Sequence, residues 1–179
     1  MADSNWLLTG PPRSGKTTVV ERVIGHLEDD GYTIGGMWSP EIRQDGARTG
    51  FALMAIQTGT RRMMASTDVE SGPRVGKYHV DIEAIDHIVE TVFDPSRPEV
   101  DLMVVDEIAP MECLSDTFVT SVTAVLDSDR PLLGTIHYRI TDGFIGAVKD
   151  REDVRLIEVT NENRDELPAR LTTEIGRLL

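Results

Sequence analysis

The segment TGPPRSGKTT at residues 9–18 constrains the fold more than any other part of the chain. It fits the pattern G-x-x-x-x-G-K-[ST] and directly follows the apolar residues Trp6-Leu7-Leu8. After the pattern, apolar residues recur at the spacing of an amphipathic helix, and Gly31 is placed to end that helix. A strand, this loop and a helix in that order form a structure that holds phosphate groups. The segment is therefore predicted to be a phosphate-binding loop.

Each residue type in this loop has a physical reason to be there. Backbone N–H groups at a helix N-terminus form a nest for an anion, and glycine lets the backbone approach closely. Pro11 and Pro12 have no N–H, so the amides must come from residues 13–18. We expect Lys16 to reach the outer phosphates and the Thr17 hydroxyl to be a ligand of Mg²⁺. The predicted nucleotide-binding residues of the loop are Gly10, Pro11, Pro12, Arg13, Ser14, Gly15, Lys16, Thr17 and Thr18.

A second motif, DLMVVDE at residues 101–107, indicates what happens to the phosphate. It is a short apolar strand that ends in two adjacent carboxylates, as a Walker B strand does. We expect Asp106 to hold Mg²⁺ through a water molecule. Glu107 is then free to orient or deprotonate an attacking water, which favours hydrolysis over transfer to a second substrate. The alternative is that Glu107 is only a solvated charge at the end of a strand.

The segment PLLGTIH at residues 131–137 is a further apolar strand with polar residues at its end. If it lies beside the 101–106 strand, Thr135 and His137 point toward the outermost phosphate and can sense or polarise it. His137 is therefore a candidate catalytic residue, and a purely structural histidine is the alternative. The other histidines do not have the spacing to a second ligand that a zinc site requires.

Strand-like runs alternate with helix-like patterns along the chain, which is typical of an α/β protein with a mainly parallel sheet flanked by helices. The expected strands are residues 5–9, 33–38, 101–106, 131–137 and 154–159. Amphipathic helices are expected around residues 19–27, 82–93, 118–126 and 167–178. Asp45-Gly46 is a strong turn signal, so a β-hairpin is expected after the second strand. Residues 57–80 have no clear period, and the chain, residues 1–179, is interpreted as one domain with an insertion at about 39–80.

The net charge and the residue composition of the chain indicate which classes of binding partner are not expected. The net charge of −13 argues against nucleic acid, because that binding comes largely from lysine and arginine at phosphates. The 15 arginines against three lysines, beside 31 acidic residues, resemble the composition of proteins from salt-loving organisms. No apolar run approaches the roughly 18 residues that span a bilayer, and the single cysteine, Cys113, excludes an internal disulfide. We expect a cytoplasmic monomer without membrane partners, with Cys113 packed in the interior rather than reactive.

Residues 43–77 differ from the rest of the chain in charge. They carry six basic and three acidic side chains, whereas the remainder carries 12 basic and 28 acidic ones. A polyanionic substrate that approaches an acidic protein is attracted by such a basic segment. We expect this segment to surround the triphosphate, with Arg74 and Lys77 closest to the outermost phosphate and Arg74 as a candidate catalytic cation. The alternative is that these arginines pair with surface carboxylates.

Six blocks of the sequence together resemble one protein family. The blocks are GPPRSGKTT, SPEIRQDGARTGF, GPRVGKYHV, VVDEIAPMECLS, GTIH and VTNENRDELPARL, and they span nearly the whole chain. They are similar to a family of small phosphate-loop nucleoside-triphosphatases that occurs in archaea, thermophilic bacteria and animals. The resemblance implies a RecA-like P-loop NTPase fold with an extra β-hairpin. It also implies slow, Mg²⁺-dependent hydrolysis of ATP, GTP, CTP, UTP and similar nucleotides to the diphosphate and phosphate.

The resemblance also points to site residues beyond the loop. The matching positions after the Walker B strand are Asp106, Glu107, Ile108 and Ala109. In this architecture the loop 160–164 adjoins the base, so Asn163 and Arg164 are further candidates, and the absence of an aromatic residue there predicts low base specificity. Two positions depart from the family. Arg13 stands where it usually has glycine, and Ala109-Pro110 stands where it usually has Gly-Lys.

Two other functions remain open on the sequence alone. Many nucleotide and small-molecule kinases of this length share the phosphate loop, and residues 138–152 could form a basic lid over an acceptor. The Asp106-Glu107 pair counts against this interpretation. The chain could also be a slow nucleotide-gated switch that binds a protein partner.

Overall fold

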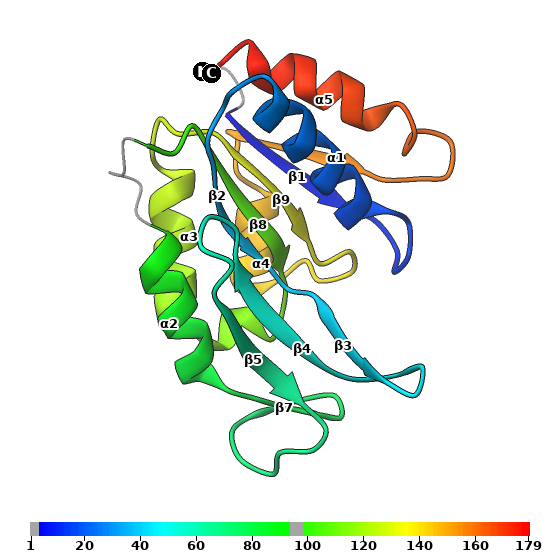
Figure 1. The fold of residues 1–179 in the computed structure, drawn as a ribbon, viewed down its shortest axis with the longest axis vertical. Coiled ribbons are helices and arrows are strands. Elements are labelled where there is room, and N and C mark those ends of the chain that lie inside the picture. Colours follow the sequence, from blue (N-terminus) through cyan, green and yellow to red (C-terminus); the bar gives the residue numbers. More distant parts are fainter. Residues whose placement is uncertain (1–3, 94–98) are drawn as a thin grey trace.

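The computed structural model describes residues 4–93 and 99–179, whose strands form one ten-stranded sheet (Figure 1). The strand order is β10-β1-β9-β8-β2-β4-β5-β7-β6, and β3 pairs with β4 outside this path. The strands from β10 to β2 are paired in parallel. Those added beyond β2 are paired antiparallel. The sheet thus has a parallel half and an antiparallel extension.

The parallel half is built from five short apolar strands. They are β1 (Asn5–Thr9), β2 (Ile34–Trp38), β8 (Leu102–Ile108), β9 (Leu132–Ile136) and β10 (Val154–Glu158). Every residue of β1 and β9 is buried. Strands of a parallel sheet with helices on both faces are apolar throughout rather than alternating, because neither face meets water. The five expected strands are confirmed to within two residues at each end.

Helices cover both faces of the parallel half (Figure 1). They are α1 (Lys16–Asp29), α2 (Ile82–Val92), α3 (Asp116–Leu126), α4 (Gly143–Lys149) and α5 (Leu167–Gly176), with a 3₁₀ turn η1 at Glu112–Leu114. In β1, Trp6 and Leu8 pack in a cluster with α1 and α5. Leu7 packs on the other face with α2 and α3. This alternation of β1 side chains divides the core into two layers.

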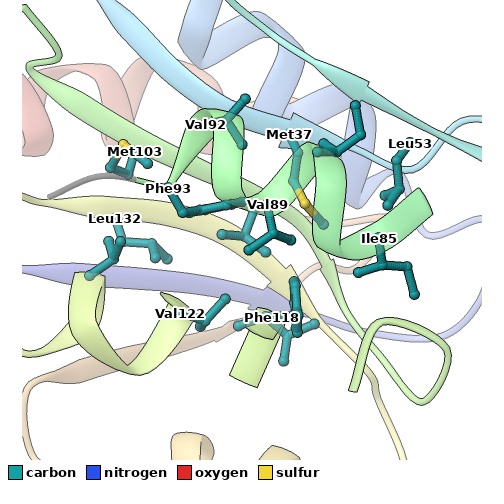
Figure 2. Close-up of a cluster of buried hydrophobic side chains, with 14 of the residues drawn as sticks. Met37, Leu53, Ile85, Val89, Val92, Phe93, Met103, Phe118, Val122 and Leu132 are labelled. Carbon is teal, nitrogen blue, oxygen red and sulfur yellow. The ribbon is translucent and has the colours of Figure 1, made fainter. Parts of the chain in front are cut away.

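The core between the sheet and α2 and α3 is the larger of the two clusters (Figure 2). Phe118 of α3 and Ile85 of α2 are fully buried there beside Met37 and Met103 of the sheet. The start of α3 is fixed by Ser115, whose hydroxyl accepts a hydrogen bond of 2.9 Å from the Phe118 N–H. These contacts hold the segment that follows β8 against the end of the sheet.

The antiparallel extension is the predicted insertion, and it is larger than the predicted hairpin. It consists of β3 (Glu41–Gln44), β4 (Ala47–Ala55), β5 (Arg61–Ser66), β6 (Arg74–Val75) and β7 (Tyr78–Val80). The hairpin of β3 and β4 turns at Asp45 and Gly46, with φ angles of 49° and 79°. The strands β5 to β7 were not expected from the sequence. The first half of β5 is exposed and its second half is buried, so its residues do not show the alternation of apolar and polar side chains that indicates a strand.

The predicted fold class is confirmed, with α4 as the one helix in the described residues that the sequence pattern did not indicate. In the described parts of the chain, no helix has the length and apolarity needed to cross a membrane.

Candidate active site

The phosphate loop lies at the carboxyl end of β1, between that strand and α1. Gly10 and Gly15 have φ angles of 140° and 103°, which favour glycine. A Cβ on Gly10 would lie 2.8 Å from the Val159 carbonyl oxygen and 3.0 Å from the Ser14 hydroxyl. Arg13 has a φ angle of 66° and therefore holds a side chain in a left-handed conformation.

The loop has polar groups suited to an anion. The Lys16 ammonium donates hydrogen bonds to the carbonyls of Gly10, at 2.9 Å, and Pro11, at 3.3 Å. The Ser14 hydroxyl is buried and has no hydrogen-bond partner among the described residues. A phosphate oxygen would satisfy Ser14 and would offer Lys16 a charged acceptor in place of two carbonyls. These residues therefore fit a bound phosphate chain.

The residues predicted to hold the metal meet at one point. The Thr17 hydroxyl, at the start of α1, donates a hydrogen bond of 2.9 Å to Oδ2 of Asp106 in β8. Thr135 of β9 donates to Oδ1 of the same carboxylate. A hydroxyl and a carboxylate beside phosphate oxygens are the hard oxygen ligands that Mg²⁺ prefers. Burial raises the pKa of Asp106, while the hydrogen bonds from both threonines and the charge of Lys16 oppose that rise.

Glu107 is the next residue of β8, and it is half-buried. The pKa of its carboxyl is raised to about 7, because burial and the Asp106 charge outweigh the lowering by the nearby Lys16 ammonium. A carboxylate with a pKa near neutrality can both accept and release a proton at neutral pH, which is what a general base requires. The structure thus brings Lys16, Thr17, Asp106 and Glu107 together.

His137 lies just beyond β9, between the ends of β1 and β8 in the strand order. Its backbone N–H donates to the Ile108 carbonyl at 3.0 Å. Its Nδ1 accepts a hydrogen bond of 3.4 Å from the Ile140 N–H. Burial lowers the pKa of the imidazole, and the charges of Lys149, Lys16 and Arg139 lower it further. Burial and the cationic neighbours therefore both favour the neutral form of His137 at the edge of the site.

The loop after β10 stands beside the phosphate loop. The Asn163 side chain accepts a hydrogen bond of 2.9 Å from the Thr160 N–H and donates one of 2.8 Å to the Glu158 carbonyl. Asn163 therefore helps to shape this loop, and its predicted role in binding the base stays a prediction. Arg164 remains exposed, and it lines a cavity of about 250 Å³ together with Gly15, Thr18, Val19, Arg22 and Asp165.

The carbonyl groups of Ile108 and Ala109 both take part in backbone hydrogen bonds after β8. The Ile108 side chain is fully buried, and its carbonyl accepts from the His137 N–H. The Ala109 carbonyl accepts from the Cys113 N–H at 3.1 Å in the turn η1. The predicted contact of these two positions with a nucleotide stays a prediction. They shape the chain that follows the two carboxylates.

The basic insertion does not surround the phosphate loop, and this prediction needs correction. Six strands lie between β1 and β6, which carries Arg74. At about 4.8 Å per strand this separation is on the order of 30 Å, beyond the reach of an arginine side chain. Arg43 and Arg48 pair with Glu41 at 2.8 and 2.7 Å, as the alternative interpretation holds. Lys77 donates to the Arg48 carbonyl at 3.1 Å.

The segment proposed as a kinase lid is held down by its own basic residues. Lys149, at the end of α4, donates to the carbonyls of Tyr138 and Ile140 at 3.1 and 2.7 Å. Arg151 pairs with Asp127 and Asp153 at 2.8 and 2.7 Å. The kinase interpretation gains no support from these contacts.

Glu112 is a site residue that sequence reasoning missed. It opens the turn η1 after β8 and is 3% exposed. Its Oε1 accepts a hydrogen bond of 3.0 Å from the Ser39 hydroxyl, and its Oε2 is buried with no partner among the described residues. Burial is the main cause that raises the pKa of this carboxyl to about 8, and the charges of Glu107 and Asp106 contribute in the same direction. The only sequence signal was a glutamate inside a run of otherwise uncharged residues.

A phosphate loop between a parallel strand and its helix, with a strand-end carboxylate that accepts a hydrogen bond from the threonine of the loop, defines the fold and site of a P-loop NTPase. A family model described as NTPase matches residues 5–172, which is most of the chain. The chain belongs to this NTPase family.

Known relatives extend over the whole chain. The nucleoside-triphosphatase THEP1 of Thermofilum pendens is 41% identical over 180 residues, covering 100% of this chain and 99% of the relative. The THEP1 of Methanothermobacter thermautotrophicus is 37% identical and covers 95% of each chain. The crystal structure of THEP1 from Aquifex aeolicus is similar with a TM-score of 0.82 at 26% identity, covering 97% of this chain and 99% of that one.

A human protein extends the comparison to animals. The solution structure of a human cancer-related nucleoside triphosphatase has a TM-score of 0.79 at 30% identity and covers 99% of this chain and 98% of that one. The family resemblance predicted from the six sequence blocks is confirmed.

Proposed function

We propose that this protein hydrolyses nucleoside triphosphates to the diphosphate and phosphate with Mg²⁺. The observation that carries the proposal is the hydrogen bond between Thr17 and Asp106, with Glu107 as the next residue of the strand. This arrangement joins a phosphate loop to a metal-binding carboxylate and leaves a second carboxylate free. The relatives named nucleoside-triphosphatases support the same reaction class.

Each residue has a separate role in the proposed reaction. The backbone amides of the loop and Lys16 hold the phosphate chain, and Thr17 and Asp106 are the residues that would hold Mg²⁺. Bound there, Mg²⁺ supplies positive charge that offsets the charge on the phosphate oxygens. Glu107 accepts a hydrogen bond from the attacking water and takes its proton as the new oxygen–phosphorus bond forms. The bond from the γ-phosphorus to the bridging oxygen breaks, and that oxygen leaves on the diphosphate.

The substrate class follows from what the site can contact. The groups described above all act on phosphate, metal or water, and none of them reads the edge of a base. We therefore propose ATP, GTP, CTP and UTP as substrates with specificity constants that agree within about tenfold, equivalent to ~1.4 kcal/mol.

The test compares phosphate release by the purified protein and by its Glu107→Gln variant. We expect the variant to bind MgATP as the parent does and to lose about 10²-fold or more in kcat, because glutamine cannot take the proton from water. Lys16→Ala should instead weaken nucleotide binding. Glu90→Gln, an exposed glutamate on α2, is the matched control and should leave both quantities unchanged.

Two results would count against the proposal. Equal turnover by the parent and Glu107→Gln would remove the hydrolytic role of that carboxylate. Phosphate transfer that appears only when an acceptor molecule is added would indicate a kinase instead.

A further inference from the structure

Glu112 is a buried acid that the proposed hydrolysis does not use. It opens the turn η1 shortly after β8, and its side chain is 3% exposed. Its Oε1 accepts a hydrogen bond of 3.0 Å from the Ser39 hydroxyl, whereas its Oε2 has no partner among the described residues. A buried polar atom without a partner is costly, so its place in a fold calls for a reason.

The sheet brings Glu112 to the end of the strand that carries Glu107. The strands β2 and β8 are parallel neighbours (Figure 1), and their register pairs Trp38 with Asp106. Ser39 follows the end of β2 and therefore lies beside the acidic end of β8. Because Ser39 donates to Glu112, the turn η1 is tied to this same end of the sheet. The charges of both acidic residues of β8 act on the Glu112 carboxyl.

Of these two acidic residues, Glu107 is the one whose carboxylate has room for a further donor. Both oxygens of Asp106 already accept a hydrogen bond, one from Thr17 and one from Thr135. The half-buried Glu107 carboxylate accepts no side-chain hydrogen bond within the described parts of the chain. A hydrogen bond from Oε2 of Glu112 to this carboxylate would satisfy both groups at once.

The Glu112 carboxyl has a proton to donate at neutral pH. Its pKa is raised to about 8, chiefly by burial and also by the charges of Glu107 and Asp106. Its own backbone N–H and the Ser39 hydroxyl oppose this rise. In the part of the chain that the structure describes, no cation is among the causes of the shift. An ionised Glu112 would therefore lack a counter-charge.

The other titratable groups around η1 do not supply that counter-charge. Burial and the charge of Glu112 raise the pKa of the Cys113 thiol to about 12, so this neighbour is neutral. The Lys16 ammonium acts on the two carboxylates of β8. Asp86 of α2 accepts a hydrogen bond from the serine that caps α3, and Asp116 in α3 is exposed.

We propose that Glu112 is a positioning residue for hydrolysis, whose carboxylic acid donates a hydrogen bond to the Glu107 carboxylate and holds it toward the attacking water. The inference rests on the proposed function, because it takes Glu107 to be the base. Hydrogen bonds of catalytic groups commonly tighten when substrate binds. A fixed donor limits the rotation of the Glu107 carboxylate and keeps its basic oxygen in the geometry for proton transfer. Ser39 holds the other oxygen of Glu112.

The experiment measures kcat and KM for MgATP in the parent, Glu112→Gln and Glu112→Ala from pH 7 to pH 9. Each kcat is taken per folded molecule, with the folded fraction measured by tryptophan fluorescence, so that a loss of stability does not count as a loss of turnover. Glutamine keeps a donor and cannot ionise, whereas alanine has no donor. At pH 7 we expect Glu112→Gln to keep kcat within about threefold and Glu112→Ala to lose about tenfold or more, with KM within about twofold in both.

The pH dependence separates positioning from a purely structural tie between η1 and β2. With a pKa of about 8, the parent carboxyl keeps its proton in most molecules at pH 7 and in about a tenth of them at pH 9. Once ionised, Glu112 has no proton to donate and repels the Glu107 carboxylate. The ratio of kcat in Glu112→Gln to kcat in the parent should therefore rise about tenfold from pH 7 to pH 9.

The control and the contrary outcomes distinguish this inference from the proposed function. Glu90→Gln, the same substitution at an exposed position of α2, should have a ratio that is independent of pH. A ratio for Glu112→Gln that stays constant from pH 7 to pH 9 would overturn the positioning role, and this result decides even if Glu112→Ala does not fold. Parental kcat in a folded Glu112→Ala would overturn it as well. Both results leave hydrolysis by Glu107 intact, whereas parental turnover in Glu107→Gln would overturn both proposals.

Discussion

Replacing Glu112 by glutamine should change the pH dependence of stability in a defined direction. The carboxyl is 3% exposed, and burial raises its pKa from an ordinary value of 4.5 to about 8. Between these two pH values the folded protein keeps the proton, whereas the unfolded chain has lost it. The unfolded state therefore binds fewer protons, and the free energy of unfolding falls as pH rises from about 4.5 to about 8.

The size of this effect follows from the same interval. It spans roughly 3.5 pH units, and at about 1.36 kcal/mol per pH unit it corresponds to about 5 kcal/mol. Solvent screening does not reduce it much, because the side chain is inside the protein. Glutamine has the same shape, cannot ionise, and can still accept the hydrogen bond from the Ser39 hydroxyl. Glu112→Gln should therefore match the parent at pH 5 within about 1 kcal/mol and be more stable by several kcal/mol at pH 9.

The assay is urea unfolding at several pH values from 5 to 9, followed by tryptophan fluorescence. Trp6 is buried between the sheet and the helices α1 and α5, so its emission reports loss of the core. Glu90→Gln on the exposed face of α2 controls for the loss of one negative charge from an acidic protein. Its stability difference from the parent should be nearly independent of pH.

A stability difference between Glu112→Gln and the parent that stays constant from pH 5 to 9 would refute this reasoning. So would a variant that becomes less stable than the parent as pH rises. The first result would mean that the pKa of this carboxyl is the same in the folded and unfolded states, and the second would mean that folding stabilises its ionised form.

Two further predictions concern the metal site and the insertion. Thr17→Ala removes the hydroxyl that donates to Asp106, so the Mg²⁺ concentration for half-maximal phosphate release should rise about tenfold or more. Thr120→Ala, at an exposed position of α3, should change it little. Arg74→Ala should change kcat and KM for MgATP by less than about threefold, because six strands separate β6 from β1. A hundredfold loss of kcat in Arg74→Ala would require the insertion to move to the phosphate loop during the reaction.

The sequence predicted the parts of this molecule whose signals are local. The phosphate loop, the helix after it and the acidic end of β8 are each encoded within ten to twenty residues, and their order along the chain places them at one edge of a parallel sheet. The strands β1, β8 and β9 are continuous apolar runs, which a sheet covered on both faces produces. The contact between Thr17 and Asp106 follows from those two facts.

The features that the sequence did not predict depend on tertiary position. Arg74 lies in a basic segment, but charge along the chain does not reveal that the segment lies at the far end of the sheet. Asn163 is polar and lies in the correct loop, yet its hydrogen bonds are used by the backbone. Glu112 is buried only because the turn η1 folds back under the end of β2, and no local pattern encodes that contact.

The place of β1 in the sheet has a consequence for how the chain matures during synthesis. β1 lies between β9 and β10, whose residues are 132–136 and 154–158, so its two neighbours are translated more than a hundred residues after it. The phosphate loop therefore leaves the ribosome early but has no sheet to support it until most of the chain has followed. Pairings of such long sequence separation form slowly, and the unpaired edges of β1 are exposed meanwhile. Nucleotide binding should accordingly be one of the last properties that the nascent chain acquires.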